Sequence, residues 1–591
     1  MKREKNEIFQ VRIEDMSDAG EGIGKADGFT WFVKDAVIGD LVEAKVMKVK
    51  KAYGFARLMK VLKPSPHRVI PPCPVARSCG GCQLQAMSYE EQLRFKERKV
   101  LGNLKRIGGL DCMELFEPII GMEDPWHYRN KALFPMGKNK DGKIITGFYA
   151  GRTHTIIENT DCLLGVPENT RILDCIRNYM EEYGIAPYEE KTHTGLVRHV
   201  LIRKGFKTGQ ILVCLVINGT VRELRSAEVL VERLQGLFDA GKAFGAGEVP
   251  DKGEVFGGRR VSGEKKEGRY SVAKEDCESG ARVVTVACSI NRERTNVILG
   301  TEIVNLYGTG SIVDFIGSIQ YQISPLSFYQ VNPCQTERLY EVALEYAGLT
   351  GAETVWDLYC GIGTISLFLA QRAKKVCGVE IIPQATEDAR RNAAQNGIRN
   401  VEFFTGRAEE ILPEQYERNH IHADVIVVDP PRKGCDQKCL ETMVKMAPER
   451  IVYVSCDSAT LARDLRYLTE NGYEVRRGRC CDMFGGTVHV ETVCLLSKLK
   501  STQHIEVEVK MDEMDLTAAE KKATYDEIKA YVLEHSGLKV SSLYIAQVKQ
   551  KCGIIERENY NKSKSEDAKQ PQCPPEKEKA IMEALKHFGM I

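Results

Sequence analysis

The sequence of 591 residues contains neither a long apolar run nor an excess of charge of one sign. No stretch approaches the roughly 18 consecutive apolar residues of a membrane-spanning helix. The first ten residues, MKREKNEIFQ, also lack the apolar core of a secretion signal. We therefore expect a cytoplasmic protein. Because the formal net charge is only +1, any surface for nucleic acid must be local.

Cysteine, in contrast, is abundant, with 20 residues. In a chain without a secretion signal this number argues against a disulfide framework and favours metal ligands or catalytic thiols among otherwise buried cysteines. The length exceeds what one hydrophobic core accommodates, so we expect two to four domains.

The N-terminal residues 1–63 alternate apolar and polar side chains in short runs separated by glycine-rich turns such as GEGIG. This pattern predicts a small β-barrel. Residues 44–63 carry seven lysines or arginines and no acid, with Tyr53 and Phe55 interleaved. The run suits either an RNA-contacting surface or a solvated basic face. The predicted strands are Phe9 to Ile13, Thr30 to Val33, Leu41 to Val49 and Ala56 to Val61.

Three further segments follow the barrel. Residues 64–335 mix β-rich runs with a helix near Val221 to Leu237, which predicts an α+β central domain, and the glycine- and lysine-rich part near 239–280 reads as a disordered insertion. Residues 336–499 alternate apolar strands with helices, as in an α/β doubly wound parallel sheet. Residues 500–591 predict a helical extension, either a simple accessory or a helix-turn-helix that holds RNA.

A cofactor loop is predicted where the strand VWDL runs into YCGIGT and a helix. Gly361 and Gly363 allow the backbone to approach a ligand, and Glu380 at the end of the next strand can accept ribose hydroxyls. The loop is not a full G-x-G-x-x-G and no Walker lysine follows. A nucleoside with a short aliphatic arm, such as S-adenosylmethionine, therefore fits better than a pyrophosphate.

Candidate catalytic residues follow the next strands. Asp429 begins DPPRKG, where Arg432 takes the place of the aromatic residue that amino-group methyltransferases use, so N-methylation is disfavoured. Cys456 in SCD lies at the same edge of the sheet, where a thiolate could add to C6 of a pyrimidine and activate C5. Glu491, in HVETV, could act as the base.

A cysteine cluster, CPVARSCGGCQLQ, places Cys73, Cys79 and Cys82 close together. Three thiols suit soft-metal ligation, and Cys162 is the best candidate for a fourth ligand. Spacing alone leaves zinc and an iron-sulfur cluster as alternatives.

Together these motifs, with HYRNKALFP, SPLSFYQVN and SCDSATLARDL, resemble the RNA (uracil-5-)-methyltransferase family, in particular its TRAM-domain, iron-sulfur members that act on 23S ribosomal RNA. The resemblance covers roughly residues 8 to 499. It implies C5-methylation of a uridine by a Rossmann-like class I methyltransferase domain, which follows an N-terminal TRAM barrel in the sequence. It implies a [4Fe-4S] cluster on the four cysteines, Cys456 as nucleophile and Glu491 as base, and Phe328 near the target base. It also implies S-adenosylmethionine contacts by Gln330, Tyr359, Glu380 and Asp429.

Two alternatives to this interpretation are a tRNA (uracil-5-)-methyltransferase, whose members generally lack the barrel and the cysteine cluster, and a non-catalytic RNA-binding or redox-sensing protein. The intact Cys456, Asp429 and Glu491 argue against the second. We expect a monomer whose partner is RNA, with no membrane association. The insertion and the extension lie outside the family pattern and bear on the choice of RNA rather than on the chemistry.

Overall fold

In a computed structural model, residues 3–151, 153–238, 280–419, 421–499, 525–552, 573–588 and 590–591 are described. The insertion predicted near 239–280 lies outside these ranges except for its last residue. The chain divides into two compact units, Met1–Lys500 and Ser501–Ile591. Among the described residues, no helix combines the length and the apolar character needed to cross a membrane.

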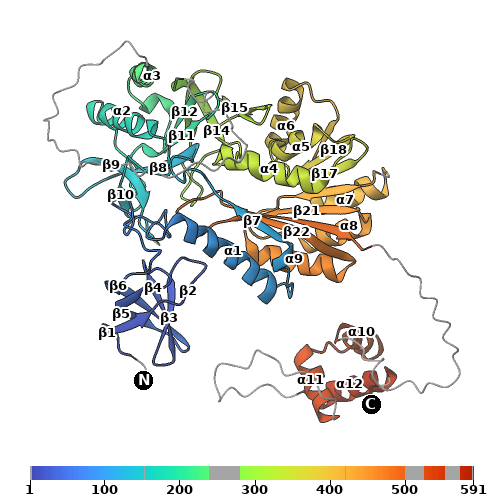
Figure 1. Ribbon diagram of the computed structural model, residues 1–591. Helices are drawn as coiled ribbons and strands as arrows, with labels where there is room; N and C mark the ends of the chain where they lie inside the picture. Colours follow the sequence, from blue (N-terminus) through green and yellow to red (C-terminus); the bar gives the residue numbers. More distant parts are fainter. Residues whose placement is uncertain are drawn as a thin grey trace, which may run out of the picture. The chain divides into compact units, whose positions relative to one another are not determined.

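The N-terminal strands form one curled six-stranded sheet in the order β1-β5-β6-β4-β3-β2 (Figure 1). Alternate side chains such as Val11, Trp31 and Val42 point into its core, which confirms the predicted barrel. The strands are β1 (Ile8–Arg12), β2 (Asp15–Met16), β3 (Gly22–Ala26), β4 (Phe29–Lys34), β5 (Leu41–Val49) and β6 (Tyr53–Lys63).

The glycine-rich GEGIG segment is only partly the turn that we predicted. Its second half belongs to β3, which pairs with β4. A Cβ atom at Gly24 would lie 2.1 Å from the carbonyl oxygen of Arg12 at the end of β1. Gly24 is therefore needed because two backbone segments approach each other closely. In the sequence, such a strand glycine cannot be distinguished from a glycine that marks a turn.

The central region is built on a seven-stranded sheet in the order β10-β9-β8-β11-β12-β13-β14, with two helices on one face. The helix α3 and the short turn η2 (Val221–Glu223) account for the helix predicted near Val221 to Leu237. The elements are β8 (Lys131–Lys138), β9 (Ile144–Tyr149), β10 (Ile156–Glu158), α2 (Glu168–Glu182), β11 (Val197–Lys204), β12 (Gln210–Ile217), α3 (Ala227–Gly236), β13 (Arg282–Ile290) and β14 (Glu302–Tyr307). A hairpin, β15 (Ile312–Ile316) and β16 (Ile319–Ile323), leads to the next sheet.

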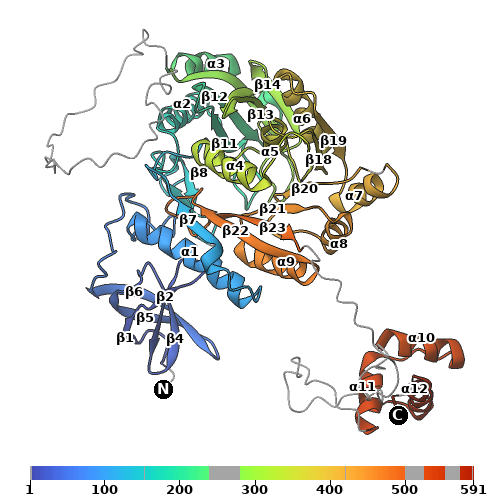
Figure 2. The same ribbon diagram turned by 45° about the vertical axis from the view of Figure 1, so that its right-hand side comes forward.

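The third sheet has eight strands in the order β19-β18-β17-β20-β21-β23-β22-β7, with helices on both faces (Figure 2). β17 to β21 are parallel, and β23 runs antiparallel to both β21 and β22, which confirms the predicted doubly wound α/β fold. The strands are β17 (Thr354–Leu358), β18 (Lys375–Glu380), β19 (Val401–Thr405), β20 (Val425–Val428), β21 (Arg450–Ser455), β22 (Tyr473–Cys481) and β23 (Glu491–Lys498). The helices are α4 (Pro333–Ala347), α5 (Thr364–Ala370), α6 (Pro383–Gln395), α7 (Ala408–Glu417), α8 (Gln437–Met446) and α9 (Ser458–Glu470).

Two elements that we had assigned to the central domain belong with this third sheet. β7 (Phe116–Ile120) adds a parallel strand beside β22, and α1 (Tyr89–Arg106) packs against α9. The predicted range 64–335 is therefore not one structural unit. The sequence could not predict this arrangement, because β7 and β22 are more than 350 positions apart and their pairing leaves no local sequence signal.

A buried ion pair joins α1 to the loop that follows β22. Lys96 Nζ lies 2.6 Å from Asp482 Oδ1, and neither side chain is exposed. Tyr89 donates its hydroxyl to the other carboxylate oxygen at 2.9 Å, and Lys96 also donates to the carbonyl of Phe484 at 3.0 Å. Burial lowers the pKa of Lys96, and the carboxylate of Asp482 opposes that shift.

The described part of the second unit contains α10 (Tyr525–Ser536), α11 (Ser542–Lys551) and α12 (Pro575–His587). The three helices share a small core that includes Ile528, Val548 and Ile581. The extension is thus helical where it is described.

We predict that Lys96→Met destabilises the first unit by about 3–5 kcal/mol, because it leaves a buried carboxylate without its partner. Urea unfolding followed by circular dichroism would measure the loss. Lys105→Met, which breaks an ion pair with both partners exposed, is the matched control and should change little. The double variant Lys96→Met/Asp482→Leu should recover part of the loss. A double variant at least as unstable as the sum of the single variants would contradict this account.

Candidate active site

The predicted nucleophile and base meet at one edge of the third sheet. Cys456 directly follows β21, and Glu491 is the first residue of β23. In the antiparallel register Ser455 pairs with Thr492, so the next residue on each strand is Cys456 and Glu491 respectively. Asp429 follows β20, the strand on the other side of β21. The three side chains thus come from the ends of three adjacent strands.

Burial dominates the electrostatics of this group. It raises the pKa of Glu491 to about 8, with a further contribution from Asp429, while Arg432 acts in the opposite direction. It also raises the pKa of Asp429 to about 6 and that of Cys456 to about 12, and both carboxylates add to the shift of the thiol. Without a substrate, the thiol and Glu491 are therefore mainly protonated at neutral pH, and Arg432 favours the thiolate.

The predicted cofactor loop adopts the backbone conformation that its glycines suggested. Gly361 and Gly363 have φ of 58° and 82°, and Tyr359 also takes a left-handed conformation with φ of 68°. The carboxylate of Glu380 accepts hydrogen bonds from the backbone N–H of Gly361 at 3.0 Å and of Ile382 at 2.9 Å. Glu380 therefore orders the loop as well as marking the end of its strand.

A cavity of about 610 Å³ opens beside this loop, along the carboxyl ends of β18, β19 and β20. Tyr359, Ile381, Ala408 and Pro431 are among the residues that line it. The side of the sheet and the size of the cavity suit a nucleoside ligand. Of the four predicted cofactor contacts, Tyr359 lines this cavity and Glu380 directly precedes its lining residue Ile381, whereas Gln330 and Asp429 are not among the lining residues. The chain thus fits S-adenosylmethionine at the strand ends where a carboxylate suited to ribose hydroxyls is found.

Gln330 and Phe328 lie in the loop between β16 and α4. The carbonyl of Gln330 accepts a hydrogen bond from Asn130 at 2.9 Å, and its side chain is buried. Phe328 is 70% exposed, which leaves its ring available for stacking. Asn332 at the end of the loop donates to the carbonyl of Met483 at 3.2 Å. This loop is therefore tied to the segment that precedes Glu491.

The four predicted metal ligands come together, although Cys162 is distant in sequence. Burial raises the pKa of Cys82 to about 12, and the thiols of Cys162, Cys79 and Cys73 add to the shift. Among the described residues, however, no three histidine, cysteine or acidic side chains are arranged to hold a single metal ion. The four thiols thus lie near one another, but they are not arranged to coordinate a single metal ion.

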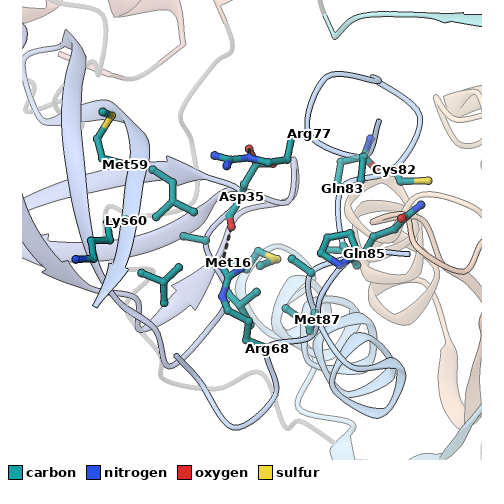
Figure 3. A pocket seen from close by; sticks show the side chains of 18 residues that line it. Met16, Asp35, Met59, Lys60, Arg68, Arg77, Cys82, Gln83, Gln85 and Met87 are labelled. Atoms are coloured by element: carbon teal, nitrogen blue, oxygen red, sulfur yellow. Dashed lines mark hydrogen bonds and ion pairs between the residues drawn. The ribbon is translucent and has the colours of Figure 1, made fainter. Parts of the chain in front are cut away.

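The cysteine segment also contacts the active-site loop and borders a second cavity. The backbone N–H groups of Gln83 and Leu84 donate to the carbonyl of Gly486, at 3.0 and 2.9 Å. Figure 3 shows Cys82 and Gln83 on one side of a cavity of about 270 Å³, with Met59 of the barrel on the other. The cysteine segment therefore lies between the barrel and the loop that precedes Glu491.

His489 is a site residue that the sequence did not single out. It lies two positions before Glu491, and its pKa is lowered to about 4 by burial and by four cations, Arg432, Lys99, Lys96 and Arg129. These cations come from segments far apart in the chain. The motif HVETV contains His489, but nothing in that pattern indicates the surrounding positive charge.

Comparison with known proteins identifies the family. The model of the TRAM domain matches residues 2–59, and that of tRNA (Uracil-5-)-methyltransferase matches residues 293–499. An uncharacterized RNA methyltransferase of Clostridium tetani is 45% identical over 493 residues, which cover 83% of this chain and 97% of that protein. The chain belongs to the RNA (uracil-5-)-methyltransferase family. The predicted resemblance is thus confirmed, and the enzyme is an RNA methyltransferase.

Two further relatives agree with this assignment. An uncharacterized RNA methyltransferase of Halalkalibacterium halodurans is 45% identical over 492 residues, 83% of this methyltransferase and 97% of that protein. The solved structure of the Pyrococcus abyssi tRNA (uracil-54, C5)-methyltransferase in complex with S-adenosyl-L-homocysteine superposes with a TM-score of 0.59 at 25% identity. It covers 83% of this chain and 100% of that one. Both comparisons extend over most of this chain.

Proposed function

We propose that this methyltransferase places a methyl group on C5 of a uridine in 23S ribosomal RNA, with S-adenosylmethionine as donor and Cys456 as a transient covalent nucleophile. The observation that supports this most is the meeting of Cys456, Glu491 and Asp429 at the strand ends, on the side of the sheet where a cavity of nucleoside size opens at the ends of β18, β19 and β20. Gln330, Tyr359, Glu380 and Asp429 would hold the donor, which supplies an electrophilic methyl group on a sulfonium.

The proposed chemistry balances with the residues of this edge. The Cys456 thiolate forms a bond to C6 of the uracil, and the electrons of the C5–C6 double bond move towards the O4 carbonyl as an enolate. C5 of the enolate would then attack the methyl group of the donor, the bond between that methyl group and the sulfonium sulfur would break, and S-adenosylhomocysteine would leave. Glu491 then removes the proton from C5, the double bond forms again, and the bond between sulfur and C6 breaks. A carboxyl group with a pKa near 8 is well matched to proton transfer at neutral pH.

The basic run of the barrel is a candidate contact surface for this RNA. Lys48 and Lys51 are exposed. Phe32, Tyr53 and Phe55 form a cluster with ring centroids 5.5 to 5.6 Å apart. Exposed cations beside aromatic rings are the usual combination for binding a single RNA strand.

A tRNA substrate is the second candidate, and two findings favour it. The family model that matches residues 293–499 is described as tRNA (Uracil-5-)-methyltransferase, and the superposed Pyrococcus abyssi enzyme acts on tRNA by its name. That enzyme aligns over its whole chain with 83% of this one. Because so much of this chain aligns with a tRNA enzyme, the presence of a barrel is weaker support for ribosomal RNA than the sequence suggested.

Mapping 5-methyluridine in cells with and without the gene would separate the two substrates. We expect the modification to disappear from 23S ribosomal RNA and to persist in tRNA. Complementation with Cys456→Ala should fail to restore it. Loss confined to tRNA would replace ribosomal RNA with the second candidate, and loss from neither RNA would contradict the proposed function.

Variants of Cys456 and Glu491 should fail at different steps of the reaction. Glu491→Gln keeps the shape of the side chain but cannot accept the C5 proton, so it should transfer one methyl group and then remain linked to the RNA. We expect a labelled protein–RNA adduct on denaturing electrophoresis after reaction with radiolabelled S-adenosylmethionine. Cys456→Ala should give neither adduct nor methylated RNA. Normal turnover by Glu491→Gln would assign the base to another residue.

For the cysteine segment we propose a [4Fe-4S] cluster on Cys73, Cys79, Cys82 and Cys162. What supports this donor set is that four thiols from two segments distant in the sequence lie near enough to raise one another's pKa. When bound, the cluster would supply a covalent crosslink between the two segments. The chain's own contribution is the pair of hydrogen bonds from Gln83 and Leu84 to Gly486, which would hold the loop before Glu491.

Anaerobically purified protein should therefore be brown and contain iron, and Cys82→Ser should lose both the visible absorption and the iron. Cys552→Ser, in the C-terminal unit, is the matched control and should keep them. Elemental analysis and visible spectroscopy measure the outcome. Zinc without iron in the wild type would show that the site is a four-thiolate zinc centre.

A further inference from the structure

Lys131 and Arg203 are two cations that stand side by side in the central sheet. β8 and β11 are antiparallel, and in their register Lys131 is the direct partner of Arg203. Directly opposed residues of two strands project from the same face of a sheet. Leu133 and Leu201, the next pair on that face, pack into the core shared with the catalytic sheet. The two cations therefore face the methyltransferase side.

No carboxylate compensates these charges. Among the described residues, neither Lys131 nor Arg203 forms a salt bridge, although Arg203 is only 2% exposed. The guanidinium donates to the backbone carbonyls of Pro325 and Ser327, and its Nε has no hydrogen-bond partner. Lys204, the next residue on β11, points to the opposite face and does have an acidic partner, Glu168, at 2.6 Å.

The surroundings of both side chains disfavour their charged forms. Burial lowers the pKa of Lys131 to about 7, with a further contribution from Arg203, and burial lowers the pKa of Arg203 to about 10. Two like charges in a partly desolvated site destabilise each other unless an anion lies between or beside them. The protein itself supplies none at this place in its described part.

The surroundings indicate what kind of anion would bind. The carbonyls that Arg203 contacts belong to the loop that carries Leu326 and Phe328, which are 45% and 70% exposed. The same loop continues to Gln330 and, through Asn332, contacts the segment before Glu491. Arg203 thus contacts the loop that carries an exposed aromatic ring, and the same loop contacts the segment before Glu491. Cations and a free aromatic ring together favour a single nucleic-acid strand over an acidic peptide, which has no base to stack.

We propose that Lys131 binds a phosphate of the RNA strand, at the strand pair where its buried neighbour Arg203 contacts the loop that carries Phe328. The inference rests on the proposed function, since it assumes an RNA substrate, and it assigns a backbone contact to a residue outside the basic run of the barrel. A phosphate oxygen beside Lys131 would accept its ammonium protons and restore the charge balance that the free protein lacks.

The test compares variants in their binding of a short fluorescein-labelled oligouridylate, measured by fluorescence anisotropy at several salt concentrations. Lys131→Met keeps the apolar stem and removes the charge. We expect it to bind about tenfold more weakly at low salt, and the slope of log affinity against log salt to become less negative by about 0.7, the amount for one contact to single-stranded RNA. Lys138→Met, at the exposed end of the same strand, is the matched control and should bind like the wild type.

Three further measurements keep the result interpretable. Thermal unfolding by circular dichroism checks that Lys131→Met is folded, and Lys131→Arg, which keeps the charge, should retain the wild-type slope. A methylphosphonate oligouridylate, whose backbone is neutral, should bind wild type and Lys131→Met equally. An unchanged salt slope in Lys131→Met would overturn the phosphate site while leaving the proposed function intact. Failure of the wild type to bind any RNA would instead overturn the proposed function itself.

Discussion

The buried ion pair between Lys96 and Asp482 is the interaction on which the geometry of the active site depends most directly. Two charges that are both inaccessible to water must remain paired, because separating them leaves an uncompensated charge in the interior. The pair fixes the start of the 482–490 loop, and Glu491 follows at its end. The position of the predicted base is therefore determined by a helix almost 400 residues earlier in the chain.

Other distant segments hold the same loop by hydrogen bonds. The hydroxyl of Tyr128 donates to the carbonyl of Gly485, and the backbone N–H of Gly486 donates to Gln92, each at 3.0 Å. The cysteine segment contributes two further bonds to Gly486. Helix α1, the cysteine segment and the central region thus converge on one short loop. Segments that precede the methyltransferase sheet in the chain thus hold the loop that leads to Glu491.

The site itself is built so that its reactive groups are neutral at rest. Burial disfavours both the thiolate of Cys456 and the carboxylate of Glu491, and the carboxylate of Glu491 further raises the pKa of the thiol. Positive charge counteracts this: Arg432 shifts both groups towards their ionised forms. Arg432 and three other cations also lower the pKa of His489. A bound anionic RNA and a cationic donor would change the electrostatic potential at these groups and therefore their pKa values.

The sequence by itself determined the parts of the protein that depend on neighbouring residues. Strand and helix patterns predicted the barrel and the doubly wound sheet, and motifs at strand ends placed Glu380, Asp429 and Cys456 on one edge, because parallel strands end on the same side. Only the tertiary structure decided the rest. The pairing of β7 with β22, the ion pair of Lys96, and the partnership of Lys131 with Arg203 join residues that are far apart in the chain. Local patterns carry no information on such pairings, because the contacts form only when the sheets and helices pack.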